Sequence, residues 1–177
     1  MLTQAENELL TQTDSTTPMG QYFRRFWQPV ALSREVPERD GPPVKVTVMG
    51  EDLVAFRDTD GHVGLINAHC PHRGAHLYFG RNEECGLRCV YHGWKFDRHG
   101  NVVDMPNVPA GARMRDEVRI KSYPTAEYGD LVWAYLGPPD GPQPELPQLE
   151  FGLVGAQSRY VSKRFNECNW AQTMEGG

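Results

Sequence analysis

The sequence predicts a mainly β fold, a small antiparallel β-sandwich or barrel with short helices before it. Apolar and polar residues alternate in short runs between residues 36 and 137, and no long helical pattern interrupts these runs. The 18 glycines and 14 prolines favour many short strands and turns over long helices. A chain of 177 residues is long enough for one domain with a hydrophobic core and part of a second domain.

The elements follow one another from the N-terminus. Residues 1–35 are expected to form a helical segment, because apolar and aromatic residues recur there at helical spacing around a polar break. Thr59-Asp60-Gly61 is typical of a hairpin turn between two strands. The expected strands of the central domain, residues 36–138, lie at 44–50, 52–58, 62–68, 94–97, 101–105, 117–124 and 130–137.

The pattern changes after this domain. Residues 139–157 are rich in proline and polar residues, which predicts a stiff linker. Residues 158–165 alternate again and predict a further strand, and the last residues are typical of the beginning of a helix. Residues 158–177 are therefore expected to begin another domain.

Composition excludes several classes of protein. A net charge of −5 argues against nucleic acid or an anionic membrane as a partner. No apolar run approaches the ~18 residues of a membrane span, and the N-terminus lacks the pattern of a secretory signal. Two of the four cysteines stand close to histidines, which suggests metal binding in a reducing cytoplasm rather than disulfides.

Two short Cys/His pairs carry the main functional signal. Cys70 and His72 form a C-x-H pair, Cys89 and His92 form a C-x-x-H pair, and 16 residues separate them. Two thiolates and two imidazoles can hold a structural zinc ion, or a [2Fe–2S] cluster in which histidines replace two cysteines on one iron. Glycine follows each pair closely and allows backbone N–H donors to approach bridging sulfides, which favours the cluster.

Other candidate ligands fit this pattern less well. His69 and His76 flank the first pair without matching its spacing, so we expect ordinary loop or strand histidines. Cys85 is expected to be a loop thiol, and Cys168 a packed helix residue rather than a nucleophile.

The segments "CPHRGAHL" and "CVYHGWKF" closely resemble the Rieske motif. With "TPMGQYFRRFWQPV", "GEDLVAFRDTDG" and "RNEECGLRCVYHGWKFD", nearly the whole chain is similar to oxygenase components of Rieske non-haem iron oxygenases, in the phthalate dioxygenase branch. The resemblance implies a Rieske-type antiparallel β-sandwich. It also implies four cluster ligands and four residues around them, namely Cys70, His72, Cys89 and His92, and Arg73, Gly74, Gly93 and Trp94.

The end of the chain resembles the helix that opens the catalytic domain of that family. There, an aspartate, two histidines and a later carboxylate follow, and two histidines with a carboxylate bind a mononuclear Fe(II). All six histidines of this sequence lie at or before His99. We therefore expect residues 158–177 to be the start of a truncated α+β catalytic domain, and the mononuclear site to be missing from this chain.

The resemblance also implies a function. The Rieske domain would accept electrons from an NADH-dependent reductase that carries flavin and an iron–sulfur cluster. It would pass them to the mononuclear Fe(II), which activates O₂ to oxidise an aromatic carboxylate, in a homotrimer or hexamer of full-length subunits. Five basic residues suggest either a collar for an acidic reductase or a mixed, solvated face: Arg73, Arg81, Arg88, Lys95 and Arg98.

One alternative function is a free-standing Rieske ferredoxin, which would need neither the N-terminal segment nor the proline-rich linker. High-potential respiratory Rieske proteins carry a disulfide and a serine hydroxyl near the cluster. The matching positions here are Ala75, Tyr91 and Trp94, so a potential at the low end of the Rieske range is expected.

Overall fold

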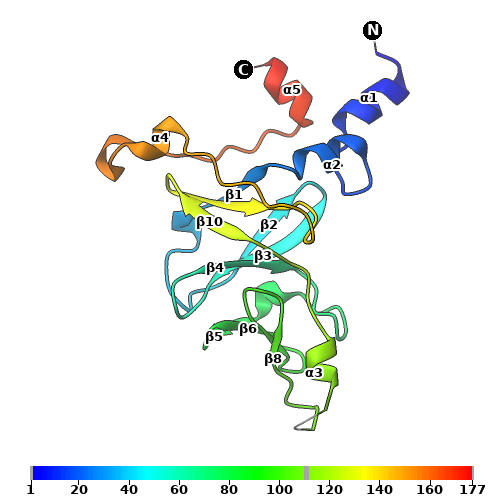
Figure 1. Cartoon of the computed structure of the whole chain (residues 1–177), viewed down its shortest axis with the longest axis vertical. Coiled ribbons are helices and arrows are strands. Elements are labelled where there is room, and N and C mark those ends of the chain that lie inside the picture. The colour runs from blue at the N-terminus through cyan, green and yellow to red at the C-terminus, as the bar shows by residue number, and fades with distance from the viewer. Residues whose placement is uncertain (1, 110–111, 177) are drawn as a thin grey trace.

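The computed structural model describes residues 2–109 and 112–176 as three small antiparallel sheets with short helices around them (Figure 1). The strands are β1 Trp27–Leu32, β2 Val44–Val48, β3 Glu51–Arg57, β4 Val63–Asn67, β5 Arg81–Glu83, β6 Gly86–Arg88, β7 Lys95–Phe96, β8 Val102–Asp104, β9 Ser122–Tyr123, β10 Thr125–Tyr128 and β11 Leu131–Tyr135. The helices are α1 Gln4–Thr11, α2 Pro18–Phe23, α3 Met114–Glu117, α4 Glu150–Leu153 and α5 Trp170–Glu175, with 3₁₀ turns at Ser33–Glu35, Leu77–Phe79 and Ala156–Ser158.

The three sheets have the strand orders β1-β11-β10, β2-β3-β4-β9 and β5-β6-β7-β8. The last sheet lies at the opposite end of the molecule from α1, α2 and α5 (Figure 1). The mainly antiparallel β architecture and the short N-terminal helices are as predicted. The hairpin predicted around Asp60 also forms, since β3 and β4 pair with Phe56 opposite Gly64.

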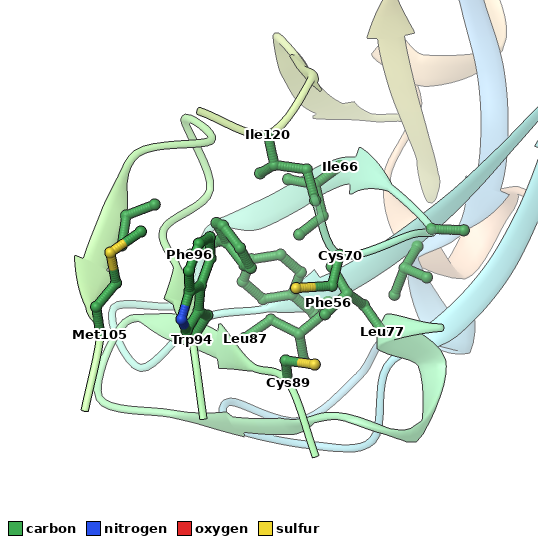
Figure 2. Packing of buried hydrophobic residues seen from close by; sticks show 13 residues of the cluster. Phe56, Ile66, Cys70, Leu77, Leu87, Cys89, Trp94, Phe96, Met105 and Ile120 are labelled. Carbon is green, nitrogen blue, oxygen red and sulfur yellow. The ribbon is translucent and has the colours of Figure 1, made fainter. Parts of the chain in front are cut away.

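Strand β3 explains how the two cores are divided. Because neighbouring side chains of a strand point to opposite faces, Val54 and Phe56 enter one buried cluster while Leu53 and Ala55 enter the other. All four are at most 1% exposed. Full burial of a side chain such as Phe56 stabilises the fold by roughly 1.5–3 kcal/mol. The first of these clusters also contains Cys70 and Cys89, so it supports the candidate site directly (Figure 2).

Three expectations differ from the structure. The segment 1–35 is not purely helical, because β1 lies within it and pairs with β11. The strand expected over 117–124 is reduced to Ser122–Tyr123 and an isolated bridge at Arg119. The strand expected over 158–165 is not formed, because no strand among the described residues pairs with this stretch.

The segments before and after the β domain pack against it and against each other. Phe23 of α2 meets Trp170 of α5 edge to face, with ring centroids 4.9 Å apart, and the indole N–H of Trp170 donates to the carbonyl of Leu10. The proline-rich stretch is held to the first sheet, where the Trp27 indole donates to the Pro144 carbonyl at 2.8 Å. Within the described part of the chain, no helix has the length and apolar character needed to cross a membrane.

Candidate metal centre

The first Cys/His pair lies in a tight loop that follows β4. The Cys70 N–H donates to the Ala75 carbonyl at 2.9 Å, and the Gly74 N–H donates to the Cys70 carbonyl at 2.9 Å. Gly74 has a φ of 68°, in the left-handed region that glycine adopts without steric cost. The loop thereby turns back on itself and presents Cys70 and His72 from one short segment.

The second pair lies in a loop of the same design between β6 and β7. The Cys89 N–H donates to the Trp94 carbonyl at 2.8 Å, and the Gly93 N–H donates to the Cys89 carbonyl at 3.0 Å. Gly93 has a φ of 76°. In both loops, a glycine with a left-handed backbone lies four residues after the cysteine. The shape of each loop therefore depends on its glycine.

The two cysteines meet at the buried side of the site. Cys70 and Cys89 are each 3% exposed, and both lie in the first core cluster (Figure 2). Burial raises the pKa of Cys70, backbone N–H groups of His72 and Arg73 lower it and the Cys89 sulfur raises it, with a net rise to about 11. A metal cation would supply the positive charge that stabilises these thiolates.

The two histidines meet beside the cysteines. The rings of His72 and His92 lie with centroids 4.6 Å apart, and Trp94 stacks on His72 at 4.5 Å with an angle of 6° between the planes. The Nδ1 atom of His72 is buried and makes no hydrogen bond to any described residue. Desolvation lowers the pKa of His72, as do His92 and Arg73, so the imidazole is neutral at pH 7 and able to ligate a metal.

The residues present fit an iron–sulfur cluster. Two buried thiols lie together, two imidazoles lie together, and one imidazole nitrogen is buried without a partner. This matches a Rieske centre, in which each of two irons takes two protein ligands. Over residues 2–109 and 112–176, no three His, Cys, Asp or Glu side chains form a group that could hold a single metal ion.

The residues predicted to surround the ligands take different positions. Trp94 is 5% exposed, and its indole N–H donates to Asn107 at 2.7 Å. The backbone of Arg73 approaches the Cys70 sulfur, whereas its side chain is exposed. Asn107 was not predicted, because it lies 13 residues beyond Trp94 on a separate loop and carries no local signal.

Of the two alternatives for the five basic residues, a collar or a mixed face, the structure shows the mixed face. Arg88 binds Glu83 and Asp104, and Lys95 binds Glu84 at 3.0 Å. Arg81 and Arg98 pair with carboxylates as well. Four of the five basic side chains are thus neutralised by partners within the chain.

The other cysteines and histidines lie outside the site. His69 and His76 pair with each other through an isolated β-bridge, with ring centroids 5.1 Å apart. Cys85 is a loop thiol in the turn between β5 and β6, as expected. The expectation for Cys168 was wrong, because this residue precedes α5 and is exposed rather than packed in a helix.

The fold and the paired Cys/His loops define an iron–sulfur protein of the Rieske type. A family model described as "Rieske [2Fe-2S] domain" matches residues 26–124, more than half of the chain, and the chain belongs to this family.

Curated relatives extend the similarity to both ends of the sequence. The chain is 49% identical over 176 residues to the phthalate 4,5-dioxygenase oxygenase subunit of Pseudomonas putida, which covers 99% of this chain and 40% of that protein. It is 43% identical over 171 residues to the 3-chlorobenzoate-3,4-dioxygenase oxygenase subunit of Comamonas testosteroni, covering 97% and 39%. The chain therefore spans about two fifths of the length of these relatives.

Solved structures agree with this relationship. A crystal structure of dicamba monooxygenase with non-heme iron and dicamba matches with a TM-score of 0.58 and 34% identity, over 66% of this chain and 35% of that one. The oxygenase in a complex with the ferredoxin of carbazole 1,9a-dioxygenase matches with a TM-score of 0.59 and 31% identity. This match covers 70% of this chain and 31% of the oxygenase chain.

Proposed function

We propose that this chain is the electron-receiving Rieske part of an oxygenase component that oxidises an aromatic carboxylate. The observation that carries the proposal is the convergence of two loops of the same design, which bring two buried thiols and two imidazoles together. The thiolates of Cys70 and Cys89 would ligate one iron, and the imidazoles of His72 and His92 the other.

A [2Fe–2S] cluster held there would take up and pass on single electrons. The protein residues set the conditions for this. The core around Cys70 and Cys89 excludes water from the sulfur side, since Leu77, Leu87 and Phe96 are fully buried in the same cluster. The histidine side is less covered, because the neighbouring Val90 and Tyr91 are 62% and 61% exposed. Electrons would therefore enter and leave on the histidine side.

We further propose the partners that the resemblance to Rieske oxygenases implies. An NADH-dependent reductase with flavin and an iron–sulfur cluster would reduce the domain. A mononuclear Fe(II) site in a catalytic domain, which residues 158–177 would begin, would receive the electrons and activate O₂. We further propose that such full-length subunits assemble as homotrimers or hexamers, so that one subunit's cluster serves a neighbour's iron through a heterologous interface.

The alternative of a free-standing ferredoxin is less well supported. A carrier needs only the β domain, yet α2 and α5 pack together through Phe23 and Trp170, and residues beyond the β domain are held to it through Trp27 and Pro144. These contacts, and the relatives' similarity across 99% of the chain, favour the oxygenase component.

Reduction by a reductase tests the proposal. The chain, purified without oxygen, is mixed with NADH and a phthalate dioxygenase-type reductase, and the visible absorption of the cluster is followed. We expect bleaching that depends on NADH and reductase, and none in the Cys70→Ser variant. A chain that carries a cluster but is not reduced by several reductases of this class would contradict the proposed role.

A further inference from the structure

Arg88 contacts the second ligand loop and two strands at once. Its side chain is 19% exposed. Its Nη1 donates to the Gly93 carbonyl at 2.7 Å and to Asp104 at 2.7 Å, and its Nε donates to Glu83 at 2.6 Å. Charge-assisted hydrogen bonds of this kind are about twice as strong as neutral ones.

These contacts connect the loop to the sheet below it. Glu83 ends β5, Arg88 ends β6 and Asp104 ends β8, while Gly93 follows His92 directly. The guanidinium therefore links the Gly93 carbonyl, which directly follows His92, to acidic side chains at the ends of β5 and β8. Arg115 of α3 also lies 3.7 Å from Asp104 and extends the network.

The first ligand loop lacks a comparable brace. A Cβ atom added at Gly74 would meet nothing within 4 Å, whereas one added at Gly93 would meet Pro106 at 3.1 Å. Among the residues that the structure describes, no side chain donates a hydrogen bond to a carbonyl of residues 70–75. Among the described residues, a side chain thus holds a backbone carbonyl of the second ligand loop and none holds one of the first.

The geometry of Arg88 matters more than its charge. Glu83 and Asp104 neutralise the guanidinium, and the arginine pairs lower the pKa of both carboxyls, that of Glu83 to about 2, so both stay charged at neutral pH. A planar guanidinium can donate in several fixed directions at once, which a lysine ammonium on a flexible stem cannot reproduce.

From these contacts we infer that Arg88 is a positioning residue, which fixes the second ligand loop and with it the orientation of His92 and Cys89 toward the cluster. This inference rests on the proposed function. It adds a residue outside the four ligands whose loss changes the geometry of the second ligand loop.

The test compares Arg88→Lys and Arg88→Gln with wild type, using Arg81→Gln as the matched control. Arg81 also pairs with Glu83, but its side chain is 70% exposed and, among the described residues, donates no hydrogen bond to the loop. The measurements are the EPR g-values of the reduced cluster and the rate of iron loss to a chelator without oxygen. We expect altered g-values and roughly tenfold faster iron loss in both Arg88 variants, because that factor corresponds to the loss of one charge-assisted hydrogen bond. The Arg81→Gln variant should behave as wild type in both measurements.

Wild-type g-values and loss rates in Arg88→Lys would overturn the inference, since charge alone would then suffice. An equal effect of Arg81→Gln would also overturn it. If neither Arg88 variant folds, Asp104→Asn keeps Arg88 and removes one anchor. We then expect a smaller change in the same two measurements, and no change would refute the inference. A wild-type chain without iron and sulfide would instead refute the proposed function.

Discussion

The two left-handed glycines of the ligand loops provide a matched pair of substitutions. Gly74 and Gly93 occupy equivalent positions, with φ values of 68° and 76°. Alanine at either site pays the cost of a left-handed backbone, roughly 1–2 kcal/mol. The sites differ in their surroundings, because only at Gly93 would the added Cβ lie close to a neighbour, Pro106, at 3.1 Å.

The magnitudes follow from that difference. Gly74→Ala should lower the free energy of unfolding by roughly 1–2 kcal/mol, the backbone cost alone. Gly93→Ala should lower it by about 1 kcal/mol more, the low end of the cost of overpacking. Gly74→Asn should recover much of the loss, because asparagine tolerates the left-handed region better than other residues.

Chemical denaturation of the cluster-free chain, followed by circular dichroism, measures these free energies. The account predicts the order wild type, Gly74→Asn, Gly74→Ala, Gly93→Ala from most to least stable. The reasoning would be refuted if Gly93→Ala were as stable as wild type, or if Gly74→Ala were the more damaging of the two alanine variants.

Further predictions concern the ligands, acid stability and activity. Cys70→Ser and Cys89→Ser should abolish the cluster. His72→Cys and His92→Cys should keep a cluster with an altered spectrum and a lower reduction potential, because a thiolate adds negative charge. A wild-type spectrum in any of these four variants would exclude the substituted residue as a ligand. Burial raises the pKa of Glu51, but hydrogen bonds from Lys121, Tyr123 and Arg24 bring it below the usual 4.5. The stability that Glu51 contributes should be complete above pH 4.5 and be lost as the pH falls through the lowered pKa. Glu51→Gln should cost about 1–3 kcal/mol at pH 7 and show less acid dependence in denaturation, and an unchanged pH profile would contradict this. Supplied with reductase, NADH and Fe(II), the 177-residue chain should form no product from aromatic carboxylates by chromatography, and product that depends on His72 would reveal a second metal site.

The sequence predicted what is encoded locally. Each Cys/His loop is closed by hydrogen bonds within six residues, so the spacing of Cys70 and His72, or of Cys89 and His92, shows the site before any tertiary structure is known. The hairpin at Asp60 is local in the same way.

Features that depend on distant partners were not predictable. Strand β1 contains Pro29 and follows a helical pattern, and only its pairing with β11, about a hundred residues later, makes it a strand. Residues 158–165 show the opposite case, an alternating pattern without a partner strand in the described chain. The role of Arg88 depends on Glu83 and Asp104, which meet only after the β5-β6-β7-β8 sheet has formed.

The central claim is that two cysteines and two histidines of this chain hold a Rieske cluster. Iron and acid-labile sulfide analysis of the chain purified without oxygen, together with EPR of its reduced form, tests this directly. The account predicts about two irons and about two sulfides per chain, and the low average g-value of mixed His/Cys ligation. One zinc ion per chain without sulfide would contradict it.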